Sequence, residues 1–239
     1  MPDPYTDLPS DIAQRLSDVR QRIATAAVTA NRAPADVRLL AVSKTFSLEH
    51  VRAAAAAGQA DFGENRVQEA LQKIDGTADL KIRWHLIGTL QSNKARKAAT
   101  SFSMIHSVDS LKLLQLIDAA AAETSSGLEV LVQVDLAGEA TKHGIPPAGA
   151  MDIVRAGANC RWARVAGLMT IPPYFDDPEK ARPYFARLRD LRDTLLKEGL
   201  EPGVMRELSM GMSHDFEIAV QEGATIVRLG TAIFGNRHV

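Results

Sequence analysis

The chain has 239 residues and a formal net charge of -1 at pH 7. This near-neutral charge gives no reason to expect nucleic acid or an anionic membrane surface as a partner. A single cysteine, Cys160, excludes an intrachain disulfide and is typical of a reducing compartment. No apolar stretch is long enough for a membrane span, and residues 1–10, acidic and proline-rich, differ from a secretory signal. We therefore expect a cytoplasmic protein.

Predicted helices and strands alternate along the whole chain. The first predicted helix spans residues 8–32, because Ile12, Leu16 and Val19 recur at helical spacing. Strands are predicted at residues 39–45, 61–63, 82–87, 103–107, 128–134, 164–169, 206–208 and 225–229. Helices are predicted between them at residues 47–57, 64–74, 94–99, 109–124, 146–157, 178–198 and 214–222.

Eight strands separated by helices, behind one leading helix, predict a single (β/α)8 TIM barrel. Residues 1–239 form one predicted domain, with residues 1–9 expected to be flexible. The alternative is an open, doubly wound sheet. The first strand is followed by no Gly-x-Gly-x-x-Gly motif, which argues against a dinucleotide site there.

Lys44 ends the first predicted strand, where the barrel fold places catalytic and binding groups. A lysine whose stem leaves an apolar wall can lose part of its proton and act as a nucleophile toward aldehydes, because desolvation disfavours the ammonium. The ordinary alternative is a lysine that marks the end of a strand with its amine in water. For one lysine alone that alternative is the better hypothesis, so other residues must decide.

Two loops with small residues and hydroxyl groups follow the last two predicted strands. They span residues 209–213 and 230–235. In barrels these two positions often bind phosphate, because backbone N–H groups at a helix start attract anions. Ordinary turn chemistry explains either loop alone, but their coincidence favours a phosphate site.

Arg228 lies two residues before Gly230 on the final strand. Its side chain points into the barrel mouth if that of Val227 points outward. A buried guanidinium needs an acceptor, and two are available: the carboxylate of Glu207 or a ring nitrogen of a ligand. Asn65, at the end of the second strand, can reach the same mouth, although its ordinary role would be a helix cap.

An amine for an aldehyde, a phosphate site and an arginine for a heterocyclic nitrogen together complement pyridoxal 5'-phosphate. An arginine disfavours a protonated pyridine ring, which is then a poorer electron sink than a ring paired with aspartate. Carbanion chemistry would be weakened, and reversible imine exchange would remain.

The sequence resembles the pyridoxal phosphate homeostasis protein family across residues 37–237. Six stretches in the same order carry the resemblance: AVSKT at 41–45, FGENRVQE at 62–69, WHLIGTLQSNK at 84–94, GLMTIP at 167–172, LSMGMS at 208–213 and VRLGTAIFG at 227–235. The resemblance implies a barrel similar to the N-terminal domain of alanine racemase, and pyridoxal phosphate held as a Schiff base on Lys44. It implies a role for five further residues: phosphate contacts from Ser209, Gly230 and Thr231, a pyridine contact from Arg228 and a pocket contact from Asn65.

Members of this family resemble cofactor carriers without established catalytic turnover. The resemblance therefore implies that the protein supplies or buffers pyridoxal phosphate, with pyridoxal-phosphate-dependent apoenzymes as partners, and we expect a monomer. Two positions depart from the family pattern. His214 stands where an acidic residue is common, and residues 139–145 keep Lys142 and Gly144 among altered neighbours.

The alternative functions are a racemase and a Schiff-base aldolase. Racemisation needs an acid/base group on each face of the substrate. In the racemases the second group is a tyrosine from a β-rich second domain, and this chain ends at Val239. Tyr174 and Tyr184 are expected in packing or loops. An aldolase would not require Arg228.

Other polar groups have ordinary explanations. The histidines lack metal-ligand spacing, and His85, inside an apolar strand, is expected as a hydrogen-bonded core residue. Lys94, Arg96 and Lys97 are expected on the solvated side of a helix, with a docking patch as the alternative.

Overall fold

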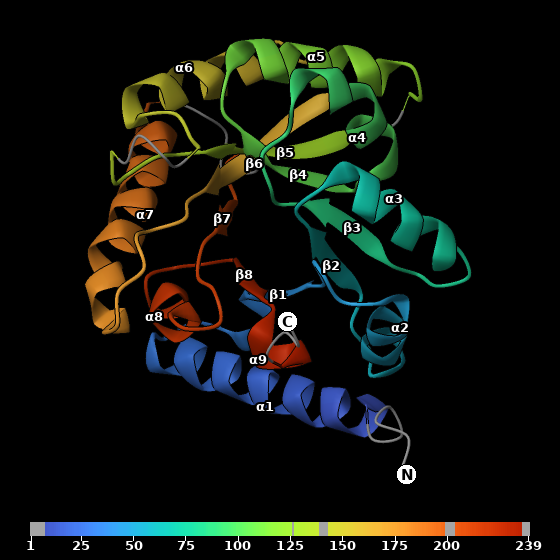
Figure 1. Cartoon of the computed structure of the whole chain (residues 1–239). Helices are drawn as coiled ribbons and strands as arrows, with labels where there is room; N and C mark the ends of the chain where they lie inside the picture. The colour runs from blue at the N-terminus through green and yellow to red at the C-terminus, as the bar shows by residue number, and fades with distance from the viewer. Residues whose placement is uncertain (1–7, 126, 139–142, 199–203, 236–239) are drawn as a thin grey trace.

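The computed structural model describes residues 8–125, 127–138, 143–198 and 204–235 (Figure 1). Eight parallel strands form a closed barrel in which each strand pairs with the next along the chain and the last pairs with the first. The predicted TIM barrel is confirmed, and the open sheet is excluded. The strands are β1 (Arg38–Val42), β2 (Asp61–Glu64), β3 (Arg83–Leu86), β4 (Met104–Val108), β5 (Leu128–Gln133), β6 (Ala163–Met169), β7 (Glu207–Ser209) and β8 (Ile226–Leu229).

Helices surround the barrel, and the leading helix α1 (Leu8–Thr29) packs against α2, α8 and α9 beside β1 and β8 (Figure 1). Of residues 1–9, only 8 and 9 belong to the described part, where they begin α1. None of the described helices is long and apolar enough to cross a bilayer. The other helices are α2 (Leu48–Ala56), α3 (Val67–Gly76), α4 (Ala95–Ser101), α5 (Leu111–Ala122), α6 (Pro147–Gly157), α7 (Arg182–Lys197), α8 (Phe216–Gln221) and α9 (Thr231–Phe234). Short 3-10 turns occupy Pro34–Asp36, Ser92–Lys94 and Pro178–Ala181.

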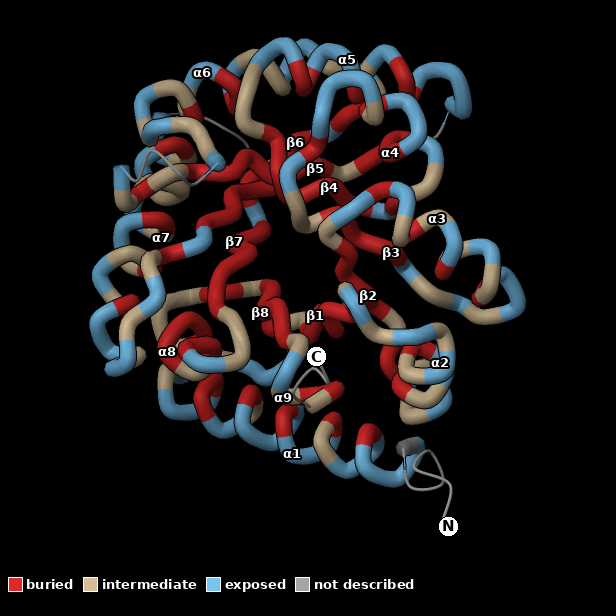
Figure 2. Tube along the Cα trace, viewed as in Figure 1, coloured by how far each residue is buried: buried red, intermediate tan, exposed pale blue. Residues whose placement is uncertain are grey.

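Alternation along the strands divides the core into two parts. In β1, Leu39 and Ala41 pack outward against the helices, whereas Leu40 points into the barrel. The strands are buried on both faces, and the helices are buried only on the side toward the barrel (Figure 2). The apolar interior cluster consists of Leu40, Met104, Leu131, Ala166, Met169 and Ile226.

Most predicted boundaries are shifted by a few residues, and three of the differences have a clear structural account. The first strand ends at Val42, so Lys44 lies in the following turn and not on the strand. The helix predicted from residue 109 begins at Leu111, and its N-cap is Ser110, whose Oγ accepts the N–H of Leu113. The predicted helix 178–198 is a 3-10 turn followed by α7, because Pro183 lacks an N–H and is tolerated only in the first helical turn.

Gly167 allows β6 and β7 to approach each other. In the pairing of β6 with β7, Gly167 lies opposite Glu207, and a Cβ there would lie 1.9 Å from the carbonyl oxygen of Glu207. Backbone atoms of a paired strand cannot move away without breaking the ladder. The absence of a side chain at residue 167 is therefore a condition for closing the barrel.

We expect Gly167→Ala to lower the free energy of unfolding by at least ~2 kcal/mol, because overpacking displaces a strand. Urea denaturation followed by circular dichroism measures the loss. Gly127→Ala is the matched control, since a Cβ at this exposed glycine would meet nothing within 4 Å. Equal stability of the two variants would contradict the proposed constraint.

Candidate functional site

The carboxyl end of the barrel brings the first and the last strand together. β1 pairs with β8 so that Ala41 lies opposite Leu229. A Cβ on Gly230 would lie only 3.3 Å from the carbonyl oxygen of Val42. The turn that carries Lys44 therefore adjoins the start of α9.

The Lys44 turn has a strained backbone that two hydrogen bonds hold. The N–H of Phe46 donates to the carbonyl of Ser43 at 3.0 Å, which closes the turn. Between them Thr45 has a φ of 70°, a conformation that a β-branched residue rarely adopts. The N–H of Thr45 donates to Oε1 of Glu69 at 2.7 Å. Strain of this kind persists only where surrounding contacts enforce it, and it fixes the direction in which Lys44 leaves the barrel.

A buried ion pair supports this turn from below. Nζ of Lys73, on α3, lies 2.7 Å from Oε1 of Glu64 and 2.7 Å from the carbonyl oxygen of Ser43. The hydroxyl of Ser43 donates to the same Glu64 oxygen at 2.7 Å. Burial raises the pKa of Glu64, and the hydrogen bonds from Lys73 and Ser43 only partly offset this. No sequence motif pointed to this pair, because neither residue lies in a loop at the mouth.

Ser213 supplies the hydroxyl group that adjoins the start of α9. Its Oγ lies 3.2 Å from the backbone nitrogen of Gly230 and 3.4 Å from that of Ala232, whose N–H groups donate to it. Thr231, the first residue of α9, is exposed beside them. A hydroxyl and backbone N–H groups at a helix start are suited to bind a phosphate.

Ser209, for which the resemblance implied a phosphate contact, faces the interior of the barrel. It ends β7 fully buried, and its Oγ contacts Arg228 at 2.8 Å and His106 at 2.9 Å. Ser213 lies beyond the strand in the loop. The predicted strand ended at residue 208, which placed both serines in one loop.

Arg228 points into the barrel, as the outward packing of Val227 requires. Its guanidinium donates to the Ser209 hydroxyl and, at 2.9 Å, to the carbonyl of Thr170. Burial lowers the pKa of Arg228 to about 10, an effect that the field of Asp215 only partly opposes. A guanidinium with this pKa stays cationic at neutral pH.

Glu207 is not the acceptor for Arg228, contrary to one of the two alternatives considered above. Its carboxylate pairs with Arg38 at 3.3 Å and with Arg206 at 3.2 Å, and it accepts the hydroxyl of Thr225. Glu207 begins β7, whereas Arg228 lies near the end of β8. Within the described residues, no carboxylate lies within ion-pair distance of Arg228.

Asn65 directly follows β2, half-buried, and its backbone closely approaches Gly88. His214 borders the phosphate loop: its Nε2 lies 3.1 Å from the carbonyl oxygen of Phe175, and its ring packs against that of Tyr174. The flagged Lys142 lies outside the described residues.

The remaining candidates lie away from this mouth or show ordinary contacts. Arg96 is exposed and pairs with Glu123 at 2.7 Å. Cys160 is half-buried, and burial raises the pKa of its thiol. In the described part of the chain no group of His, Cys, Asp and Glu side chains is arranged to hold a metal ion.

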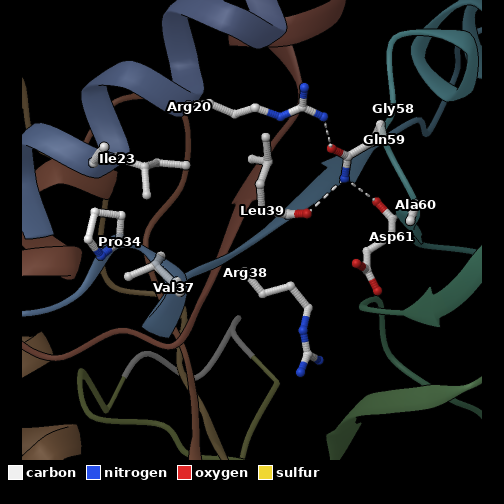
Figure 3. A pocket seen from close by; sticks show the side chains of 12 residues that line it. Arg20, Ile23, Pro34, Val37, Arg38, Leu39, Gly58, Gln59, Ala60 and Asp61 are labelled. Carbon is white, nitrogen blue, oxygen red and sulfur yellow. Dashed lines mark hydrogen bonds between the residues drawn. The ribbon is translucent and has the colours of Figure 1, made fainter.

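A cavity of about 430 Å³ opens at the opposite, amino end of the barrel. Its wall includes Arg20 on α1, Arg38 and Leu39 on β1, and Asp61 on β2 (Figure 3). None of the six residues predicted to contact the cofactor lines it. The site residues instead surround the carboxyl mouth, where an amine, a guanidinium and anion-binding N–H groups suit a phosphorylated aldehyde with a basic ring.

Comparison with known proteins agrees with this chemistry. Residues 15–238 match the family model described as "Alanine racemase, N-terminal domain". Two proteins named "Pyridoxal phosphate homeostasis protein" align along nearly their whole length. The protein from Pseudomonas aeruginosa is 46% identical over 228 residues, which are 95% of this chain and 96% of that protein. The protein from Aquifex aeolicus is 43% identical over 224 residues, 94% of this chain and 97% of that protein.

The chain belongs to the pyridoxal phosphate homeostasis protein family. A solved structure of PipY from Synechococcus elongatus PCC7942 with pyridoxal phosphate bound superposes with a TM-score of 0.83. It is 39% identical and covers 94% of this chain and 100% of that chain. The resemblance read from the six sequence stretches is thus confirmed at the level of the pyridoxal phosphate homeostasis protein family.

We expect Lys73→Met to lower the free energy of unfolding by roughly 3–5 kcal/mol near neutral pH, because it leaves the Glu64 charge buried without a partner. The loss should shrink as the pH falls, since a carboxyl whose folded-state pKa is raised is destabilising only where it must ionise. Urea denaturation at a series of pH values measures both effects.

The matched control is Lys97→Met, which removes an exposed lysine on α4 and should change stability by about 0.5 kcal/mol or less. A loss of stability in Lys73→Met that does not depend on pH would contradict the role of the Glu64 charge.

Proposed function

We propose that this protein binds pyridoxal 5'-phosphate at the carboxyl mouth of its barrel and holds it covalently through Lys44. The observation that supports this proposal most strongly is the convergence of three separate elements: the turn after β1, the buried guanidinium on β8 and the N–H groups that open α9. The cofactor would supply an aldehyde, with which the Lys44 amine would condense while the aldehyde oxygen leaves as water.

The phosphate is bound at the start of α9 in this proposal. The backbone N–H groups of Gly230 and Ala232 would donate to it together with the hydroxyl of Ser213, and Thr231 adjoins the same loop. Gly230 is suited to this position, because a side chain there would crowd the end of β1. Asn65, which directly follows the adjacent strand β2, would line the pocket wall.

Arg228 would face the ring nitrogen. A guanidinium can donate a hydrogen bond to that nitrogen but keeps its own proton at neutral pH, so the ring stays unprotonated. An unprotonated ring withdraws little charge from a bound amino acid. This supports a carrier that exchanges its cofactor over an enzyme that stabilises carbanions.

The biological role that we propose is supply and buffering of pyridoxal phosphate in the cytoplasm, with pyridoxal-phosphate-dependent apoenzymes as recipients and a monomeric carrier. A near-neutral net charge and one free cysteine are compatible with this setting. Racemisation remains the alternative function to test.

We expect borohydride reduction of the loaded protein to leave a pyridoxyl adduct on Lys44, located by peptide mass spectrometry. Lys44→Ala should lose the adduct and the absorption of the bound cofactor, because the amine that would form the covalent bond is removed. Lys197→Ala, at the exposed end of α7, is the control and should keep both.

An adduct retained in Lys44→Ala would place the covalent link on another lysine. A racemase assay with several amino acids tests the alternative function. Turnover that Lys44→Ala abolishes would replace the carrier function with the racemase alternative.

We expect Ser213→Ala to weaken binding of pyridoxal phosphate by roughly tenfold or more, the effect of losing a hydrogen bond to a charged group. Binding of pyridoxal, which has no phosphate, should not change. Titrations with both compounds measure the difference, and equal weakening of the two would place Ser213 away from the phosphate.

A further inference from the structure

A continuous chain of hydrogen bonds crosses the interior of the barrel. It begins at Arg228, whose Nη1 lies 2.8 Å from Oγ of Ser209. Ser209 Oγ lies 2.9 Å from Nδ1 of His106, and His106 Nε2 lies 3.0 Å from Nδ1 of His85. The chain ends at Asp61, with His85 Nε2 3.1 Å from its Oδ1. All five residues are at most 5% exposed.

This chain of hydrogen bonds connects the two ends of the barrel. Asp61 begins β2 and lines the cavity at the amino end, where Figure 3 shows it near Arg38. Arg228 lies at the other end, beside the turns that form the mouth. Since β5 and β6 separate β4 from β7 in the barrel wall, the bond between His106 and Ser209 spans the interior.

The carboxylate end and the neutral imidazoles together determine the direction of every hydrogen bond. An ionised carboxylate only accepts, so a neutral His85 donates through Nε2 to Asp61 and accepts on Nδ1 from Nε2 of His106. The Nδ1 of a neutral His106 then accepts the proton of the Ser209 hydroxyl, while the Ser209 oxygen accepts from Arg228, which only donates. Both neutral histidines are thus protonated on Nε2.

The electrostatics of the chain agree with these assignments. Burial opposes ionisation of Asp61, but hydrogen bonds from His85 and Arg83 outweigh it and lower the Asp61 pKa to about 2. Burial lowers the pKa of His85, and of His106 well below its usual value. Neutral imidazoles between a cation and an anion let each hydrogen bond polarise the next.

We propose that Ser209 and His106 are positioning residues that hold the Arg228 guanidinium in one orientation at the mouth, with the carboxylate of Asp61 setting the direction of the chain from the opposite end. If the cofactor binds as proposed above, Ser209 affects its ring through Arg228 and does not contact its phosphate. This consequence rests on the proposed function.

The first test uses the cofactor-free protein. Two-bond proton–nitrogen correlation spectra report which imidazole nitrogen carries the proton, and His85→Gln and His106→Gln assign the two rings. We expect both rings to be neutral and protonated on Nε2. A proton on Nδ1 of His106, or a doubly protonated ring, would overturn the assigned direction.

The second test compares Ser209→Ala with Ser107→Ala, which removes a buried hydroxyl from the neighbouring Gly88 contact and leaves the chain intact. In the cofactor-free protein, nitrogen relaxation of the Arg228 guanidinium should show lost order in Ser209→Ala only. Unchanged order in Ser209→Ala would overturn the positioning role, whether or not the protein binds pyridoxal phosphate.

The third test measures binding. Ser209→Ala should weaken pyridoxal phosphate and pyridoxal by the same factor, roughly tenfold, and shift the absorption of the bound form, because both compounds share the ring. Weakening confined to pyridoxal phosphate would instead make Ser209 a phosphate residue and overturn the inference. If the wild-type protein binds neither compound, the proposed function fails, and the relaxation measurement still decides the inference.

Discussion

The pairing of β8 with β1 is the contact on which the candidate site depends. It closes the barrel, and it places the turn that carries Lys44 next to the residues that open α9. Parallel strands end on the same side, so a closed barrel collects the loops of all its strands around one mouth. Gly167 and Gly230 permit this closure, because each leaves room for the backbone of a neighbouring strand.

Buried charged groups beneath the mouth stabilise the candidate site. Lys73 neutralises Glu64 beneath the Lys44 turn, and the Ser209–His106–His85 chain connects Arg228 with Asp61. Glu64 pairs directly with Lys73, and the Arg228 guanidinium donates to Ser209 and to the carbonyl of Thr170, which reduces the penalty of burying each charge. The same contacts that reduce the penalty also fix the direction of the functional side chains.

The proposed carrier function depends on two features of the mouth. Arg228 remains a cation beside the proposed ring position, and the strained backbone at Thr45 fixes the exit of Lys44. The cavity at the amino end is separate from this mouth and shares with the interior chain only its terminal carboxylate, Asp61.

The sequence alone was sufficient for the alternation of strands and helices, for the barrel, and for an inward-facing Arg228, because period-two and helical hydrophobic patterns act over neighbouring residues. It did not separate Ser213 from Ser209, because the predicted strand ended at residue 208 and β7 ends at Ser209. Strand and helix ends were less certain: α5 begins at Leu111 and not at residue 109, and Lys44 lies in a turn beyond β1. Only the tertiary structure decided the partners of the buried charges. His106 and Ser209 are 103 residues apart, and Glu207 pairs with Arg38 across 169 residues. Such contacts depend on barrel register and on which strands face each other across the interior, and no local pattern specifies either.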